Sequence, residues 1–375
     1  MATEPTGRNL ILCFDGTNNQ FGTENTSIVR LIQVLNRDPD HQLLFYDPGV
    51  GTLPEPGYVS ALGQWFSKVS GLAFGAGLFD KIADAYRFLM EHWRPGDRVF
   101  VFGFSRGAYT ARALAASLHL FGLLPSGSEN LLPYVLRLFR ASPRRLRESK
   151  GKQAEFWALC DEFRETFSRA LARYPDRRFP IHFLGLFDTV SSVGWAWDPL
   201  RLPFTAENPS VAIVRHAISI DERRCFFRQN ALSAAPNQDL QEFWFAGVHS
   251  DVGGGYPEAD GGLWREAYRW MLDEAKGAQY LTDPQREIAV WQRHAPPAQA
   301  WTQLQHESLK GWWWLAECFP KLSITVRPGG VDRIWGSGAE DASRRAPICM
   351  LPRVGGSETG IPPIHRPICR HHCWR

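Results

Sequence analysis

The sequence lacks any apolar run long enough to cross a bilayer. Its longest weakly polar stretch, Val69–Phe79, falls well short of the roughly 20 residues that a spanning helix needs. A signal-peptide pattern is also missing, because Met1–Gln20 has no basic start and its apolar run, Leu10–Phe14, is too short. We therefore expect a soluble protein folded in the cytoplasm, and export by a machine that needs no cleavable signal remains open.

Cysteine is scarce, and neither sign of charge is in excess. Seven cysteines, an odd number spread over 375 residues, argue against a disulfide framework. The 42 Lys and Arg residues nearly balance the 39 Asp and Glu residues, so the net charge is +3 and no nucleic-acid partner is expected. Hydrophobic residues make up 44% and charged residues 22%, which excludes wholesale disorder.

Short apolar runs, each followed by a small polar or glycine-rich turn, recur along the chain. The runs Asn9–Phe14, Arg98–Phe102 and Ile181–Phe187 are nearly continuous in apolar character, which is typical of parallel strands covered on both faces. Further strands are expected at Leu43–Tyr46 and Glu242–Val248, and helices at Thr26–Asn36, Gly77–His92 and Ala108–Phe121. This alternation predicts a doubly wound, mostly parallel α/β sheet, in which ligands bind at the carboxyl ends of the strands.

The pattern changes between Leu123 and Pro180 to amphipathic helix without a convincing strand. We expect a helical insertion there, between elements of the sheet, that caps the site. Within it, Arg137–Lys152 holds seven basic residues against the single acid Glu148. Two interpretations stay open: a solvated helical face, or a surface that docks on anionic lipid.

The segment Gly103–Gly107 reads Gly-Phe-Ser-Arg-Gly and matches the nucleophile-elbow pattern G-x-S-x-G. It follows the apolar run Val99–Phe102 and precedes the helical pattern Ala108–Leu114, which is the strand-turn-helix context that the pattern requires. Such a turn strains the serine backbone and places its hydroxyl at a helix N-terminus. The sequence therefore predicts Ser105 as a nucleophile, and a tight turn without chemistry is the alternative.

Two more polar residues follow strands in the order that a serine nucleophile needs. Asp188 comes directly after Ile181–Phe187, and His249 opens a glycine-rich loop. The chain order Ser, Asp, His is that of α/β-hydrolases, so we predict Asp188 as the orienting acid and His249 as the base. The alternatives are a turn-capping aspartate and a structural histidine. Three competing histidines are less well placed: His182 inside a strand, His216 in an expected helix and His41 ahead of the catalytic region.

The loop that starts at Asp15, Gly16 and Thr17 has two interpretations. It resembles half of the D-x-D-G-T motif of haloacid-dehalogenase-type phosphatases, but Cys13 stands where that motif needs its nucleophilic aspartate. We predict instead an oxyanion loop, whose backbone N–H groups near Gly16 complement that of Arg106 around a tetrahedral intermediate. Asp15 would hold this loop by hydrogen bonds, and a purely structural turn is the alternative.

No metal or cofactor site is predicted. Asp251, beside Gly253–Gly255, either orders the histidine loop or binds a cation, but a single carboxylate lacks the convergent ligands that calcium needs. The terminal run Cys369–Cys373 has soft donors without a second cluster at suitable spacing. The acyl-transfer chemistry proposed for Ser105 requires no cofactor.

Together these motifs resemble one family of α/β-hydrolase domains, the one that includes the first class of type VI secretion phospholipase effectors. The resemblance is carried by the segments Phe14–Asn19, Gly103–Arg112, Phe187–Val190 and Gly247–Tyr256, with further blocks at His216–Arg224 and His306–Trp314. It implies an α/β-hydrolase-like fold with Ser105 as nucleophile, Asp188 as acid and His249 as base. It also implies hydrolysis of carboxylic esters, often phospholipid acyl esters, and it leaves any secretion partner unknown.

The resemblance spans residues 8–325, which we expect to form one catalytic domain. After Pro320 the periodicity is lost, and residues 326–375 are expected to form an irregular, divergent tail. Family members tend to continue with a basic stretch and an Ile-His-x-Ser segment, whereas Ile364–Pro367 runs here into a Cys- and His-rich end. Two rival functions remain: a non-catalytic interaction module that retains the fold, and a hydrolase of small soluble esters.

Overall fold

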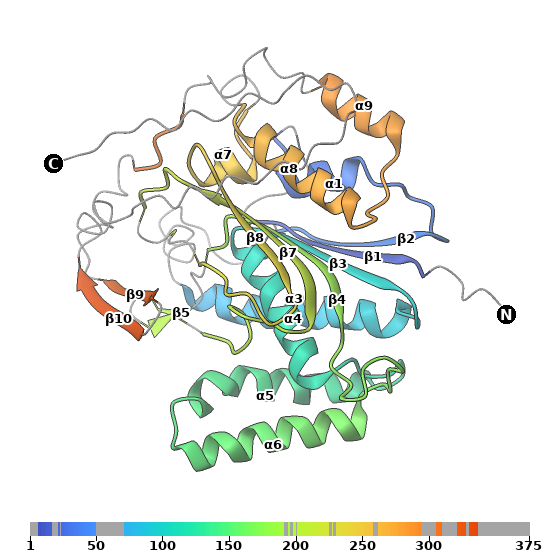
Figure 1. Cartoon of the computed structure of the whole chain (residues 1–375), viewed down its shortest axis with the longest axis vertical. Coiled ribbons are helices and arrows are strands. Elements are labelled where there is room, and N and C mark those ends of the chain that lie inside the picture. The colour runs from blue at the N-terminus through green and yellow to red at the C-terminus, as the bar shows by residue number, and fades with distance from the viewer. Residues whose placement is uncertain are drawn as a thin grey trace, which may run out of the picture. The chain divides into compact units, whose positions relative to one another are not determined.

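A six-stranded sheet, parallel throughout, is the centre of the fold (Figure 1). The computed structural model describes residues 7–16, 22, 24–49, 71–190, 194–195, 198–199, 201–224, 227, 230–257, 262–293, 305–309, 321–327 and 330–336. The sheet strands are β1 (Asn9–Phe14), β2 (Gln42–Asp47), β3 (Arg98–Phe104), β4 (Ile181–Phe187), β7 (Val211–Ser219) and β8 (Asp239–Phe245). Their order is β2-β1-β3-β4-β7-β8, so the chain winds outward from β1 in both directions. This confirms the predicted doubly wound α/β sheet.

Helices cover both faces of the sheet (Figure 1). The helices beside it are α1 (Ser27–Gln33), α3 (Gly71–His92), α4 (Arg106–Phe121), α7 (His249–Gly253), α8 (Trp264–Gly277) and α9 (Pro284–Arg293). Along β1 the side chains alternate: Leu10 and Leu12 pack in the cluster with α3 and α4, whereas Ile11 and Cys13 pack in the cluster with α1 and α8. Because both sides of β1 are buried, its sequence is apolar from Leu10 to Phe14.

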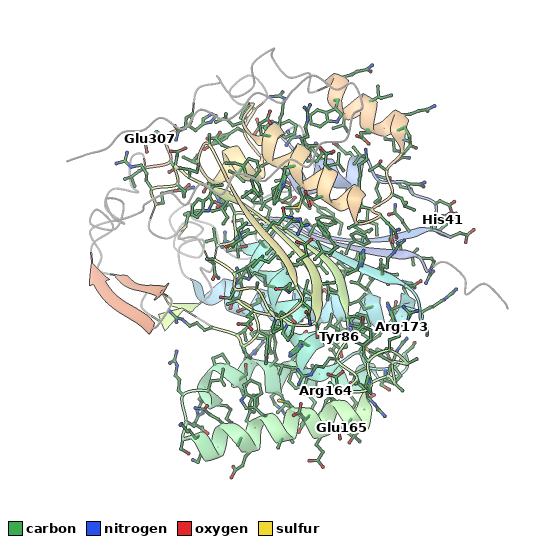
Figure 2. The ribbon with its side chains drawn as sticks, viewed as in Figure 1. His41, Tyr86, Arg164, Glu165, Arg173 and Glu307 are labelled. Carbon is green, nitrogen blue, oxygen red and sulfur yellow. The ribbon has the colours of Figure 1, made fainter. Side chains whose placement is uncertain are left out.

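The predicted insertion consists of a short 3-10 helix, η1 (Glu129–Leu131), and helices α5 (Leu132–Arg145) and α6 (Lys150–Phe167). These helices form a layer outside α3 and α4 (Figure 1). Phe139 of α5 packs edge-on against Phe79 and Phe121, at ring-centroid distances of 6.3 and 6.4 Å. The Arg164 guanidinium of α6, labelled in Figure 2, donates to the Leu120 carbonyl at 2.8 Å and so ties α6 to the end of α4.

Several predicted elements differ from the structure. Helix α3 begins at Gly71, six residues before the expected Gly77. His216 lies in strand β7 rather than in a helix, because residues 211–219 pair in parallel with both β4 and β8. Strand β8 spans Asp239–Phe245 and so begins three residues before the expected Glu242–Val248. Its register is set by β7, whose Ser219 pairs with Phe245 as the last partner, and Gly247 then turns the chain at a φ of 104°.

Outside the main sheet, four strands form two small antiparallel pairs. They are β5 (Gly194–Trp195) with β6 (Asp198–Pro199), and β9 (Lys321–Arg327) with β10 (Gly330–Gly336). The β9–β10 hairpin was not expected, although Leu, Ile and Val alternate with polar residues over 321–327 as they do in strands. No helix in the described part of the chain is both long and apolar enough to cross a membrane.

Candidate active site

Ser105 occupies the tight turn between β3 and α4, with an unusual backbone conformation. Its φ is 58° and its ψ is −123°, a combination that costs a non-glycine residue on the order of 1–3 kcal/mol. Its backbone N–H donates to the Phe187 carbonyl at 3.0 Å, and its own carbonyl accepts from Val190 at 3.2 Å. The turn after β3 is therefore joined to the turn after β4, which carries Asp188.

The glycines on either side of Ser105 allow this turn to form. A Cβ atom on Gly103 would lie 2.6 Å from the Ala108 Cα atom, and one on Gly107 would lie 2.4 Å from the Phe14 carbonyl oxygen. Any larger residue would push α4 away from β1 and β3. The same close approach places the loop after β1 beside the start of α4, since the Asp15 carbonyl would lie 2.5 Å from a Cβ on Gly107.

Asp188 and His249 meet in a buried hydrogen bond. The Asp188 Oδ2 atom lies 2.7 Å from His249 Nδ1, and the two residues are only 1% and 4% exposed. Asp188 has a left-handed φ of 39°, and both its oxygens are held by Ser219 of β7: Oδ1 accepts from the Ser219 backbone N–H at 2.9 Å and Oδ2 from its hydroxyl at 2.8 Å. An ionised carboxylate only accepts hydrogen bonds, so Nδ1 of His249 carries the proton.

Aromatic rings and a second carboxylate surround His249. Phe104, the residue before Ser105, stacks on the imidazole at a centroid distance of 4.7 Å, and Phe227 packs edge-on against it at 4.9 Å. The Glu222 Oε2 atom accepts the backbone N–H of His249 at 3.2 Å. Burial acts to raise the pKa of Glu222, but hydrogen bonds from Arg224 and its charge bring that pKa below its usual value. Glu222 is thus a carboxylate beside the histidine that sequence analysis did not identify.

The loop after β1 is ordered by the Asp15 carboxylate. Oδ2 of Asp15 accepts from the Thr26 hydroxyl at 2.9 Å and from the Tyr46 hydroxyl at 3.1 Å, and Oδ1 accepts from the Gly16 backbone N–H at 2.7 Å. The Gly16 N–H is therefore directed at Asp15 in this conformation. Thr17 lies outside the described residues. Arg106, the residue after Ser105, is half-buried, and burial lowers the pKa of its guanidinium to about 10.

His216 forms a second histidine–carboxylate pair near Asp188. Its Nδ1 atom lies 2.8 Å from Glu242 Oε1, and its Nε2 atom accepts the backbone N–H of Thr189 at 3.2 Å. Because Nε2 accepts, the proton of the neutral ring is on Nδ1 and points to Glu242. His216 is fully buried and holds the residue next to Asp188 in place. The wrong helix assignment concealed this neighbour. The signal that could have revealed it is the number of β-branched residues in 211–219, namely Val211, Ile213, Val214 and Ile218, which favour a strand.

The metal candidates give no site in the described part of the chain. Both oxygens of Asp251 are engaged within the histidine loop and its surroundings: Oδ2 accepts from the Val248 N–H at 3.0 Å and Oδ1 lies 2.7 Å from His306 Nδ1. Asp251 therefore orders the loop. Among the described residues no three His, Cys, Asp or Glu side chains gather as metal ligands do. The run Cys369–Cys373 lies outside them.

Comparison with known proteins identifies relatives that share part of this chain. It is 38% identical over 237 residues to an uncharacterized protein of Saccharomyces cerevisiae, a match that covers 61% of this chain and 33% of that protein. A crystal structure of an uncharacterized protein from Pseudomonas aeruginosa is 18% identical, with a TM-score of 0.43, and the match covers 76% of this chain and 49% of that one. A Tle1 effector bound to the VgrG spike of the type 6 secretion system is 20% identical, with a TM-score of 0.35 and coverages of 67% and 52%.

The chain thus spans about a third of the yeast relative and about half of each solved chain. A family model matches more than half of this chain. The model for the catalytic domain of the Tle1-like phospholipase effectors of the type VI secretion system (T6SS) matches residues 8–274, which include Ser105, Asp188 and His249. On that match, the chain belongs to the family of Tle1-like T6SS phospholipase effector catalytic domains.

Proposed function

We propose that this chain is a serine hydrolase that cleaves carboxylic esters, in particular the acyl esters of lipids. Ser105 is the nucleophile, His249 the general base and Asp188 the acid that orients it. The observation that carries the proposal is the buried hydrogen bond between Asp188 and His249, formed beside a serine held in a strained turn. Strained serine turns of this kind expose the hydroxyl at the carboxyl edge of an α/β-hydrolase sheet.

The position of the His249 ring proton supports transfer of the Ser105 proton to Nε2. Because Nδ1 of His249 donates to Asp188, the lone pair of the ring is on Nε2. The Ser105 hydroxyl loses its proton to Nε2 as its oxygen bonds to the ester carbonyl carbon. That proton passes to the leaving alcohol when the ester C–O bond breaks, and water then hydrolyses the acyl-enzyme by the same steps. Asp188 and the neighbouring Glu222 both favour the imidazolium form that these steps create.

An oxyanion site is proposed on both sides of Ser105. In nucleophile elbows the backbone N–H of the residue after the serine, here Arg106, contributes one donor. The loop after β1 lies against the start of α4, as the close approach of Gly107 to the Asp15 carbonyl indicates. The Gly16 N–H is directed at the Asp15 carboxylate, so Asp15 holds the loop. The second donor is proposed to come from the Asp15–Asn18 loop, in which Thr17 is the candidate.

A lipid substrate also requires contact with a membrane, and we assign that contact to the turn between α5 and α6. Five exposed basic residues lie there, Arg144, Arg145, Arg147, Lys150 and Lys152, which we call the basic turn. The acid within this turn, Glu148, pairs with Arg145 at 3.3 Å. In Figure 1 this turn lies on the left, the side towards which the strands of the sheet run. Each such residue near an anionic surface contributes roughly 1 kcal/mol of attraction.

One experiment separates this function from its rivals. The purified chain is incubated with a fluorophosphonate probe, and is then assayed on phospholipids and on short acyl esters, with Ser105→Ala as the control. Labelling that Ser105→Ala abolishes supports the serine mechanism, and lack of labelling supports a non-catalytic interaction module. Turnover of short esters alone supports a hydrolase of small soluble esters, because fold does not decide substrate.

A further inference from the structure

Two carboxylates from different segments hold the start of helix α7, the short helix that begins with His249. Glu222, which lies three residues beyond β7, accepts the backbone N–H of His249 at 3.2 Å. Asp251, in the first turn of α7, accepts the backbone N–H of Val248 at 3.0 Å. The first N–H groups of a helix have no partner within the helix, so these two carboxylates determine how the His249 backbone is placed.

Each of these carboxylates is in turn held by a short segment near residue 307. Nδ1 of His306 lies 2.7 Å from Asp251 Oδ1, and the His306 backbone N–H donates to Asp251 Oδ2 at 3.3 Å. The Ser308 hydroxyl donates to Glu222 Oε1 at 2.9 Å. The His306 ring also stacks on Tyr256, just after α7, at a centroid distance of 3.8 Å.

We propose that His306 and Ser308 are positioning residues for His249, acting through Asp251 and Glu222. This inference rests on the proposed function, in which His249 is the base. We call the pair His306 and Ser308 the bracket, because these two residues hold the two carboxylates at the start of α7. The bracket lies more than 30 residues beyond residue 274, where the family match ends. The active unit therefore extends past the matched catalytic domain.

The two carboxylates are buried, so the loss of a hydrogen bond to either one has a large effect on its position. Glu222 is 5% and Asp251 2% exposed, and a buried carboxylate that loses a hydrogen bond must find another partner or move. Either movement shifts the His249 backbone and with it the imidazole, whose Nε2 must face Ser105. Misplacing a catalytic group by about 1 Å costs on the order of 10²-fold in rate. Glu307, labelled in Figure 2, instead forms an exposed ion pair with Arg223 at 3.2 Å.

The test compares variants that remove each donor with variants that keep it. Ser308→Ala and His306→Phe remove the hydroxyl and the ring N–H, whereas Ser308→Thr keeps a hydroxyl and His306→Asn keeps a donor near the position of Nδ1. Glu307→Gln is the surface control. All are made in the full chain and measured for kcat and KM on a short soluble ester, and for amide hydrogen exchange over residues 246–255.

We expect kcat to fall roughly 10-fold in Ser308→Ala and in His306→Phe, with KM little changed, and on the order of 10²-fold in the double variant. Exchange should rise over 246–255 while β1, β3 and β4 keep their protection. Ser308→Thr, His306→Asn and Glu307→Gln should resemble the wild type. If the double variant had the kcat and the hydrogen exchange of the wild type, the proposal that His306 and Ser308 position His249 would be wrong. If the wild type itself has no ester turnover, the proposed function fails, and the exchange data alone decide whether the bracket holds α7.

Discussion

The Nδ1 atom of His249 lies 2.7 Å from the Oδ2 atom of Asp188, although the two residues are 61 positions apart in the chain. Each follows a strand, β8 or β4, and β7 lies between those strands in the sheet. The intervening strand contributes Ser219, which donates two hydrogen bonds to Asp188. The acid is therefore held in place by the strand that separates it from the base.

Ser105→Ala should abolish ester turnover and leave the fold intact. The hydroxyl is needed for bond formation, whereas the backbone turn depends mainly on Gly103 and Gly107. Loss of a triad member typically costs at least about 10⁴-fold in rate. Turnover and fluorophosphonate labelling are measured beside the thermal unfolding midpoint. Turnover retained in a pure preparation of this variant would exclude the serine mechanism.

Asp188→Asn should lower kcat by about 10⁴-fold with little change in KM, because Asp188 holds the His249 proton on Nδ1 and does not bind substrate. An amide in this place can present its NH₂ group to Nδ1, which moves the ring proton to Nε2 and removes the base. Steady-state kinetics on a short ester measures the effect. A larger loss of kcat in Asp251→Asn than in Asp188→Asn would show that Asp251, and not Asp188, is the acid.

His216→Leu should reduce kcat roughly 10-fold, because it removes the acceptor of the Thr189 N–H beside Asp188. His216→Gln keeps an acceptor of similar reach and should recover much of the activity. The two variants are compared by kcat, by KM and by the downfield proton signal of His249 Nδ1 in NMR spectra. Equal kcat values and an unchanged signal in both variants would remove His216 from the positioning of Asp188.

Replacing Arg144, Arg145 and Arg147 of the basic turn by Gln should weaken binding to anionic vesicles, while hydrolysis of a short soluble ester stays unchanged. Binding of the wild type should rise with the anionic lipid fraction and fall with salt, because the attraction fades beyond about a Debye length. Co-sedimentation at low and high salt measures both effects.

A matched control makes the same change of charge elsewhere on the molecule. Arg37, Arg94 and Arg173 are exposed, and Arg173, labelled in Figure 2, lies on the side of the molecule away from the basic turn. Their replacement by Gln should leave vesicle binding close to that of the wild type. Equal weakening in the two triple variants, or no dependence on anionic lipid, would indicate that residues 144–152 form a solvated face.

His119 should make the folded chain less stable as the pH falls from about 6.5 towards 3. Burial, together with the charges of Arg178 and Arg164, lowers the pKa of His119 to about 3. In this window the unfolded chain takes up a proton at His119 and the folded chain does not, so stability decreases with falling pH by up to about 1.4 kcal/mol per pH unit. His119→Gln should remove that part of the slope in urea unfolding measured between pH 4 and pH 7. An unchanged slope would contradict the prediction.

The placement of Ser105, Asp188 and His249 after strands could be predicted because each depends on a local pattern. An apolar run, a turn and a helix are encoded within about 20 neighbouring residues, and parallel strands bring such turns to one edge of a sheet. His216 was wrongly predicted to lie in a helix because the structure of its segment does not depend on local pattern alone. The segment 211–219 becomes a strand through its pairing with β4 and β8, which are distant in the chain.

Local pattern therefore determined the doubly wound fold, the elbow at Ser105 and the order of the three polar residues, since these follow from the spacing of apolar residues and glycines. Only the tertiary structure determines which of the polar side chains form hydrogen bonds with one another. The contact of His249 with Asp188, the attachment of His216 to Thr189 and that of Ser308 to Glu222 join residues 61, 27 and 86 positions apart. Hydrogen bonds between such distant residues leave no periodic trace in a sequence, because they depend on how whole strands and helices pack.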